Sequence, residues 1–160
     1  MKKRLLPVLL GMLLFSSICY AHDVIEIGGT LVYNPIIFNE GEVGGGINIA
    51  VFSEIYESFG LGVFLNFARG ANDMGTLDFL LGPYYAFSIT EKLSLPVSFG
   101  VYAGIMYLGY GGNITLQYAF HKNFSVFARF QCVYAYFTAP GVKTAESIVV
   151  SPCIGIGFRF

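Results

Sequence analysis

Apolar side chains recur at every second position through most of this chain. The pattern is clearest in the last segment, 148–160, where the alternate apolar positions are Ile148, Val150, Pro152, Ile154, Ile156, Phe158 and Phe160. The positions between them are mostly small or polar. A period of two predicts a β-strand with one apolar face and one mixed face. In a soluble sandwich the apolar face would meet a second sheet, and in a transmembrane barrel it would meet lipid.

The same alternation predicts further strands along the chain, and together with the last segment they make eight. Their approximate ranges are 24–34, 43–52, 59–68, 77–89, 95–107, 113–120 and 124–136. Each segment is bounded by polar or glycine-rich residues, which are typical of turns. Strands of about 9–11 residues suit a tilted crossing of a bilayer. The pattern therefore predicts eight antiparallel strands joined as consecutive hairpins.

The connections between these strands differ in length. Longer polar connections follow the first, third and seventh strands, whereas 90–92 and 121–123 are short turns. We also expect a connection over 53–58 and a very short loop over 109–112. Long loops outside the cell and short turns in the periplasm are typical of outer-membrane barrels. Both chain termini would then lie on the periplasmic side.

The first 21 residues have the pattern of a secretory signal peptide. A basic start is followed by an apolar run and then by small residues, with cleavage expected near Ala21. The domain organisation is therefore a signal peptide over 1–21 and one domain over 22–160. A permanent helical anchor and a lipoprotein acylated at Cys19 are the alternatives.

Composition favours a membrane protein without transmembrane helices in the domain. Hydrophobic residues make up 55% of the chain and charged residues 12%, against about 25% charged in ordinary soluble domains. No segment after the signal peptide has the ~20 continuous apolar residues of a membrane helix. Only helices and closed barrels satisfy their backbone groups in lipid. The predicted fold class is an all-β, eight-stranded, antiparallel, up-and-down transmembrane β-barrel, and a net charge of −1 gives no indication of nucleic-acid binding.

The C-terminal strand, which ends in Phe158 and Phe160, resembles the terminal signature of bacterial outer-membrane β-barrels. The aromatic residues expected at the strand ends also resemble the two aromatic girdles of such proteins. The whole domain is similar in architecture to the small eight-stranded outer-membrane barrels. This resemblance implies residence in the outer membrane of a diderm bacterium, contact with outer-membrane lipid, and recognition of the C-terminal strand by the barrel assembly machinery.

The predicted lumen is mostly packed, because eight strands enclose a space that side chains can fill. The large residues expected inside are Phe64, Tyr84, Tyr102 and Phe127, beside many glycines. A wide water channel is not expected from this set.

Four charged residues fall on inward positions and are expected to form interior ion pairs. They are Glu26, Asp78, Arg129 and Arg159. Glu26 begins the first strand and Arg159 ends the last, and closure makes these strands neighbours. We therefore expect Glu26 and Arg159 to pair at the periplasmic end. A structural pair that fixes closure is favoured over a gate.

The sequence offers little for catalysis or for cofactors. His121 and Ser125 are a possible base and nucleophile, but they flank a turn and no acid accompanies them. Cys132 and Cys153 are expected on opposite faces, so no disulfide is predicted, and no metal-ligand spacing is present. We expect no enzyme activity, cofactor or metal.

Three functions remain open. A structural, membrane-stabilising barrel is favoured. A narrow conduit for small hydrophobic molecules is the alternative, with lateral exit near Pro83, because proline weakens strand pairing. Pro152 could weaken the wall in the same way. The third possibility is an adhesin that binds at the cell surface through the first, second and fourth loops.

Overall fold

The computed structural model describes residues 23–35, 42–70, 75–104, 107–137 and 146–160. The described residues form eight strands, β1 to β8. Their bounds are Asp23–Val32, Gly44–Tyr56, Phe59–Arg69, Gly75–Ser88, Leu93–Gly104, Tyr107–His121, Phe124–Phe137 and Glu146–Arg159. The predicted signal peptide, 1–21, lies outside the described residues.

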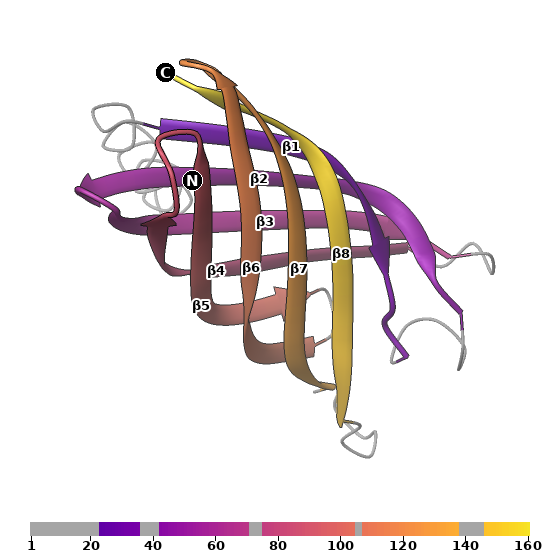
Figure 1. The fold of residues 1–160 in the computed structure, drawn as a ribbon. Helices are drawn as coiled ribbons and strands as arrows, with labels where there is room; N and C mark the ends of the chain where they lie inside the picture. The colour runs from indigo at the N-terminus through magenta and orange to yellow at the C-terminus, as the bar shows by residue number, and fades with distance from the viewer. Residues whose placement is uncertain (1–22, 36–41, 71–74, 105–106, 138–145) are drawn as a thin grey trace, which may run out of the picture.

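The strands form one closed antiparallel barrel in which each strand pairs with its neighbours in the sequence (Figure 1). β1 closes the barrel by pairing with β8, in a register that places Val24 opposite Arg159 and Glu26 opposite Gly157. The fold class is therefore the one that the period-two pattern predicted. The end at which β2, β4 and β6 turn into the next strand, close to Phe160, is called the turn end below, and the opposite end is the loop end.

Two connections differ from the sequence prediction. β2 continues to Tyr56, so the predicted connection over 53–58 shortens to a two-residue turn in which Glu57 adopts a φ of 47°. The predicted loop over 109–112 is instead part of β6. The glycines at 109, 111 and 112 suggested a turn, but these residues pair with neighbouring strands instead. Glycine allows close backbone approach within a curved sheet. Gly111, for example, would place a Cβ 2.4 Å from the Cys132 carbonyl oxygen.

The orientation of Tyr107 also differs from the prediction, which placed this side chain on the outer face. Tyr107 is only 2% exposed and lies inside the barrel. β6 begins at Tyr107, and its inward positions alternate from there through Gly109 and Gly111 to Asn113. The error follows from treating 109–112 as a loop, because that loop broke the alternation.

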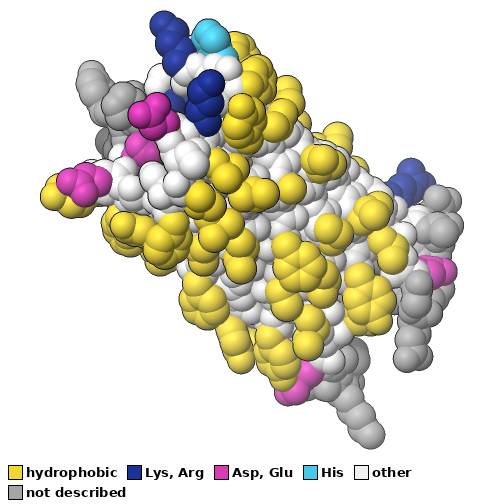
Figure 2. Space-filling view, in the orientation of Figure 1, with side chains coloured by type: hydrophobic (Ala, Val, Ile, Leu, Met, Phe, Trp, Pro, Cys, Tyr) yellow, Lys and Arg dark blue, Asp and Glu magenta, His cyan; other side chains and the backbone are white. Residues whose placement is uncertain are grey.

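The exterior of the barrel is an apolar belt. Ile27, Phe67, Phe99 and Ile154, on four different strands, are between 52% and 71% exposed. Figure 2 shows apolar side chains over the barrel wall and charged side chains gathered towards its ends. An exposed apolar surface of this extent requires lipid or another apolar partner.

No helix in the described part of the chain is long and apolar enough to cross a membrane.

The strand pairing is interrupted beside prolines. The β4–β5 register pairs Leu81 with Val101 and resumes at Tyr84 with Ser98, so Gly82 and Pro83 are left out of this ladder. Proline has no N–H to donate to a neighbouring strand, which accounts for the interruption.

The β5–β6 ladder has a similar interruption at Pro96. It stops after Ser94 paired with Gln117 and resumes at Val97 paired with Ile114. Strand β5 is therefore interrupted on both sides, at Phe99 and Gly100 towards β4 and at Leu95 and Pro96 towards β6.

The closing seam between β1 and β8 is interrupted at Pro152. The ladder ends with Thr30 opposite Cys153, and an isolated bridge between Tyr33 and Val150 follows. The Thr30 hydroxyl donates a hydrogen bond of 3.1 Å to the Pro152 carbonyl oxygen, which ties the two strands at the gap.

Candidate functional site

The turn end of the lumen is hollowed by two adjoining cavities of about 130 and 140 Å³. Both are lined by Val24, Ser88, Ser94, Gln117 and Arg159. We call this space the vestibule. Its walls come from strands far apart in sequence, because closure of the barrel brings β1 and β8 beside each other. The vestibule is therefore the hollow part of the lumen at the turn end.

An ion pair blocks the lumen beyond the vestibule. Arg129 on β7 contacts Glu26 on β1 through its Nη2 and the Glu26 Oε2, and both side chains are 1% exposed. These strands both flank β8, so the pair joins second-neighbour strands inside the barrel instead of adjacent strands. A buried charge needs a partner and hydrogen bonds, and each of these residues supplies the partner for the other.

Aromatic rings surround the guanidinium of Arg129. The Cζ atom lies 5.4 Å from the ring centroid of Phe52, 4.7 Å from that of Phe64 and 4.8 Å from that of Phe127. Cations are attracted to aromatic faces at this range. The three rings fill the space around the charge, so ion pair and rings together form a plug, which we call the Arg129 plug.

Hydrogen bonds hold the remaining donors of the plug. Arg129 Nε donates to Thr115 at 2.9 Å, and Nη1 donates to Asn48 Oδ1 at 2.7 Å. Gln117 donates to Glu26 Oε1 at 3.2 Å. The plug is thus tied to strands β1, β2, β6 and β7, and it is a fixed polar network instead of a mobile side chain in a channel.

The predicted pair of Glu26 with Arg159 is wrong. Arg159 lies at the mouth of the vestibule, where its side chain is 51% exposed, and its Nη2 is 3.6 Å from Glu54 Oε1. Glu26 lies two positions deeper along β1 than Val24, the cross-strand partner of Arg159. The prediction considered charges on adjacent strands, whereas a narrow lumen also brings together charges that face each other across it.

Asp78 lies in a second polar cluster closer to the loop end. Asp78 Oδ1 accepts hydrogen bonds from the hydroxyls of Thr76 and Tyr107, and Asn34 donates to the Tyr107 hydroxyl at 3.2 Å. Asp78 is 1% exposed. Its described partners are therefore hydroxyl groups, in place of the predicted ion pair.

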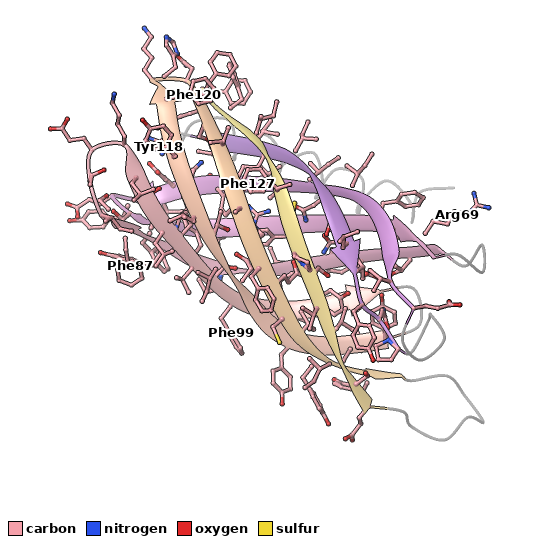
Figure 3. All side chains as sticks on the ribbon, turned by 45° about the vertical axis from the view of Figure 1, so that its right-hand side comes forward. Arg69, Phe87, Phe99, Tyr118, Phe120 and Phe127 are labelled. Carbon is pink, nitrogen blue, oxygen red and sulfur yellow. The ribbon has the colours of Figure 1, made fainter. Side chains whose placement is uncertain are left out.

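The large side chains expected in the lumen are placed there. Phe64, Tyr84, Tyr102 and Phe127 are each at most 4% exposed. Pro83 lies on the outer wall, and Pro96, which sequence reasoning missed, is buried and lines the vestibule. Figure 3 shows Phe87 and Phe99 projecting away from the barrel. Phe158 and Phe160 lie at the turn end, where Phe158 packs against Phe124 with ring centroids 5.0 Å apart.

The residues with chemical potential outside the plug are held in structural contacts. His121 accepts a hydrogen bond from the Asn123 backbone N–H, and Ser125 accepts one from Gln117. Cys132 is exposed and Cys153 buried, and both are free thiols. Within the described ranges no three potential metal ligands of the His, Cys, Asp or Glu type come together. The loops proposed for adhesion fall largely at 36–41, 71–74 and 138–145, outside the described residues.

Comparison with solved structures identifies the class of fold. Ail, the attachment invasion locus protein of Yersinia pestis, matches with a TM-score of 0.55 and 18% identity over 88% of this chain and 99% of that one. OprG of Pseudomonas aeruginosa matches with a TM-score of 0.54 and 13% identity, over 88% and 96% of the two chains. Neisserial surface protein A matches with a TM-score of 0.52 and 15% identity, over 86% of this chain and 94% of that one.

No protein-family model and no curated protein sequence matches this chain. The structural matches and the closed eight-stranded topology nevertheless agree. The chain has the fold of the small eight-stranded outer-membrane β-barrels.

Proposed function

We propose that this protein is an integral outer-membrane barrel with a structural role, sealed against ions and sugars by the Arg129 plug. The apolar belt and the similarity to outer-membrane barrels support the location, with the turn end in the periplasm. Lipid around the belt and the machinery that assembles outer-membrane barrels, acting on β8, are the proposed partners.

The observation that carries the sealed barrel is the arrangement of the ion pair. Glu26 and Arg129 meet inside the lumen, with three phenylalanine rings around the guanidinium. Opening a channel would separate two desolvated charges, which is costly in a protein interior. A rigid, filled barrel stabilises the surrounding bilayer without transporting ions or sugars.

Vesicles containing the refolded protein test the seal. Refolded wild-type barrel should give no KCl conductance in a planar bilayer and no release of trapped sugar from vesicles. The double variant E26A/R129A removes both charges and the guanidinium at the centre of the plug, so it should conduct. Its folded state is checked by the faster gel migration of the unboiled sample. A wild-type barrel that conducts KCl would contradict the sealed lumen.

Loss of the gene tests the structural role. A strain without the gene should become more sensitive to detergent and chelator, and the wild-type gene should restore resistance. A P83V variant should restore it equally well if the role is structural. Failure of P83V to complement, despite normal assembly, would favour transport.

A second function is favoured by the weak pairing of β5. The gaps at Pro83 and Pro96 flank this strand, and Pro96 and Tyr84 line the vestibule. A small apolar molecule entering the vestibule could leave sideways between β4, β5 and β6 into the membrane. This conduit does not require passage through the Arg129 plug.

Uptake of an apolar fluorescent solute into vesicles tests the conduit. The wild-type barrel should raise the uptake rate above that of protein-free vesicles, and P83V and P96V should lower it by restoring donors at the two seams. P152V, at the β1–β8 seam, is the matched control and should leave uptake unchanged. Equal uptake with and without protein would remove this function.

A further inference from the structure

A row of uncharged polar side chains crosses the interior wall on β5, β6, β7 and β8. Its members are Ser98, Asn113, Gln131 and Ser151, which are all at most 5% exposed. The register makes them successive cross-strand partners: Ser98 lies opposite Asn113, Asn113 opposite Gln131, and Gln131 opposite Ser151. We call this set the polar row.

The polar row is under-bonded. Among the described residues, Ser98 Oγ, both amide atoms of Asn113, Gln131 Nε2 and Ser151 Oγ have no hydrogen-bond partner. The neighbouring Arg129 plug, by contrast, has a described partner for each nitrogen of its guanidinium. Buried polar groups are almost always paired with protein or with ordered water. Leaving so many unpaired in one row would be costly for the fold, so water is the partner that the chemistry calls for.

One end of the row lies close to the vestibule, although no member of the row lines it. Tyr84, which lines the vestibule, lies opposite Ser98 in the β4–β5 register. Inward side chains on facing strands are about 5 Å apart, so a water molecule between two of them could bond to both. Two further buried polar atoms, Tyr102 Oη and Asp78 Oδ2, lie nearer the loop end.

We propose that the polar row carries a file of water molecules that enters from the vestibule and makes the barrel permeable to water but not to ions. In the conformation described here the row atoms are closed to solvent. Water therefore enters when the amide groups of Asn113 and Gln131 turn, which rotates side-chain bonds and breaks the 3.4 Å hydrogen bond that Asn66 Nδ2 donates to Gln131 Oε1. Ions are held back because the row offers them no charge to replace their hydration shell.

Osmotic shrinkage of vesicles, followed by stopped-flow light scattering, tests this proposal. Vesicles with refolded wild-type barrel should shrink several-fold faster than protein-free vesicles, while KCl conductance stays at the background. The variant N113L/Q131M keeps the γ-branched shape at position 113 and the unbranched stem at position 131, with leucine larger than asparagine, and it removes the polar partners. It should return the rate to that of protein-free vesicles.

The matched control is I114V/C132A, which changes the lipid-facing neighbours of the same two row positions and should leave the rate at the wild-type value. S98V, at the start of the row, provides a second test if N113L/Q131M does not fold. Shrinkage no faster than in protein-free vesicles, a rate that N113L/Q131M and S98V leave unchanged, or KCl conductance by the wild-type barrel would each overturn the proposal. A conducting barrel would also contradict the sealed lumen, whereas slow shrinkage alone would leave the sealed lumen intact.

Discussion

Arg129 places a charge in the middle of a narrow lumen, and its neighbours determine whether that charge stabilises the barrel. The side chain contacts Glu26, Thr115 and Asn48, so its nitrogens are hydrogen-bonded. Breaking such a buried pair from one side leaves the other charge without compensation, which commonly costs about 3–5 kcal/mol. Arg159, which is half exposed at the vestibule mouth, belongs to the class of surface pairs worth at most about 1 kcal/mol.

The two arginines should therefore respond very differently to substitution. R129M is expected to lower the free energy of unfolding by about 3–5 kcal/mol, because Glu26 would remain buried and unpaired. The measurement is urea unfolding of the barrel refolded in lipid vesicles. R159M is the control and should change it by less than about 1 kcal/mol.

Removing both charges should recover much of that loss. E26Q/R129M is expected to be more stable than R129M, because the glutamine amide carries no charge. E26Q combined with R159M should show no such recovery, since Arg159 contacts Glu54 instead. Equal effects of R129M and R159M would disprove the assignment of the pair.

Gly82 is constrained by the close approach of the neighbouring backbone. A Cβ at Gly82 would lie 2.1 Å from the Phe99 carbonyl oxygen, whereas a Cβ at Gly45 would meet nothing within 4 Å. G82A should therefore destabilise the barrel by roughly 1–3 kcal/mol through overpacking, and G45A should have little effect. Urea unfolding compares the two, and similar midpoints would show that β4 and β5 can separate at this point without cost.

Strand β5 has interrupted pairing with both of its neighbours. Its ladder is interrupted beside Pro83 on one side and beside Pro96 on the other. Backbone hydrogen bonds protect amides from exchange with solvent, and local opening removes that protection. The consequence is a strand that opens more readily than the rest of the wall.

Hydrogen–deuterium exchange should reveal this difference. Amides of β5 are expected to exchange faster than those of β2, which pairs with β1 and β3 along most of its length. P96V should slow exchange in β5 by restoring a donor. P152V is the control, because Pro152 interrupts the seam between β1 and β8, and neither of these strands pairs with β5. Exchange in β5 as slow as in β2 would show that the gaps do not loosen the strand.

The sequence was sufficient to predict the elements but not the contacts between opposite walls. Alternation placed Phe64, Asn48 and Arg129 on inward faces, because lipid outside and packing inside impose a strict period of two. It could not predict that Arg129 would meet Glu26, since partners across a lumen depend on strand tilt and register. Glycine was also ambiguous, because turns and crowded strands both favour it, and this ambiguity displaced Tyr107 to the wrong face.

The molecule as a whole has an apolar exterior and a polar centre, which is the reverse of a soluble protein. Most exposed side chains on the wall are large and apolar, whereas Glu26, Arg129 and Asp78 are buried. Water would penalise this surface, and the alkyl chains of a bilayer would not.

Folding of the mature chain should therefore depend on lipid. The urea-unfolded chain, diluted into phospholipid vesicles, is expected to give a β-rich circular dichroism spectrum and an unboiled form that migrates faster than the boiled form on a gel. Diluted into buffer alone, it should aggregate. A stable, monomeric β-protein in buffer would contradict a membrane barrel.

The apolar belt has a consequence for the history of the sequence. A side chain that faces lipid needs only to be apolar. Ile, Leu, Val and Phe are therefore nearly interchangeable at the outward positions, which are about half of each strand. Substitutions among these apolar residues are therefore expected to be tolerated at outward positions. The sequence can change there while the architecture is kept. Alignable identity with Ail is 18% although 88% of the chain superposes in fold. The inward positions are therefore expected to tolerate fewer substitutions, because Arg129 and its partners leave few acceptable replacements.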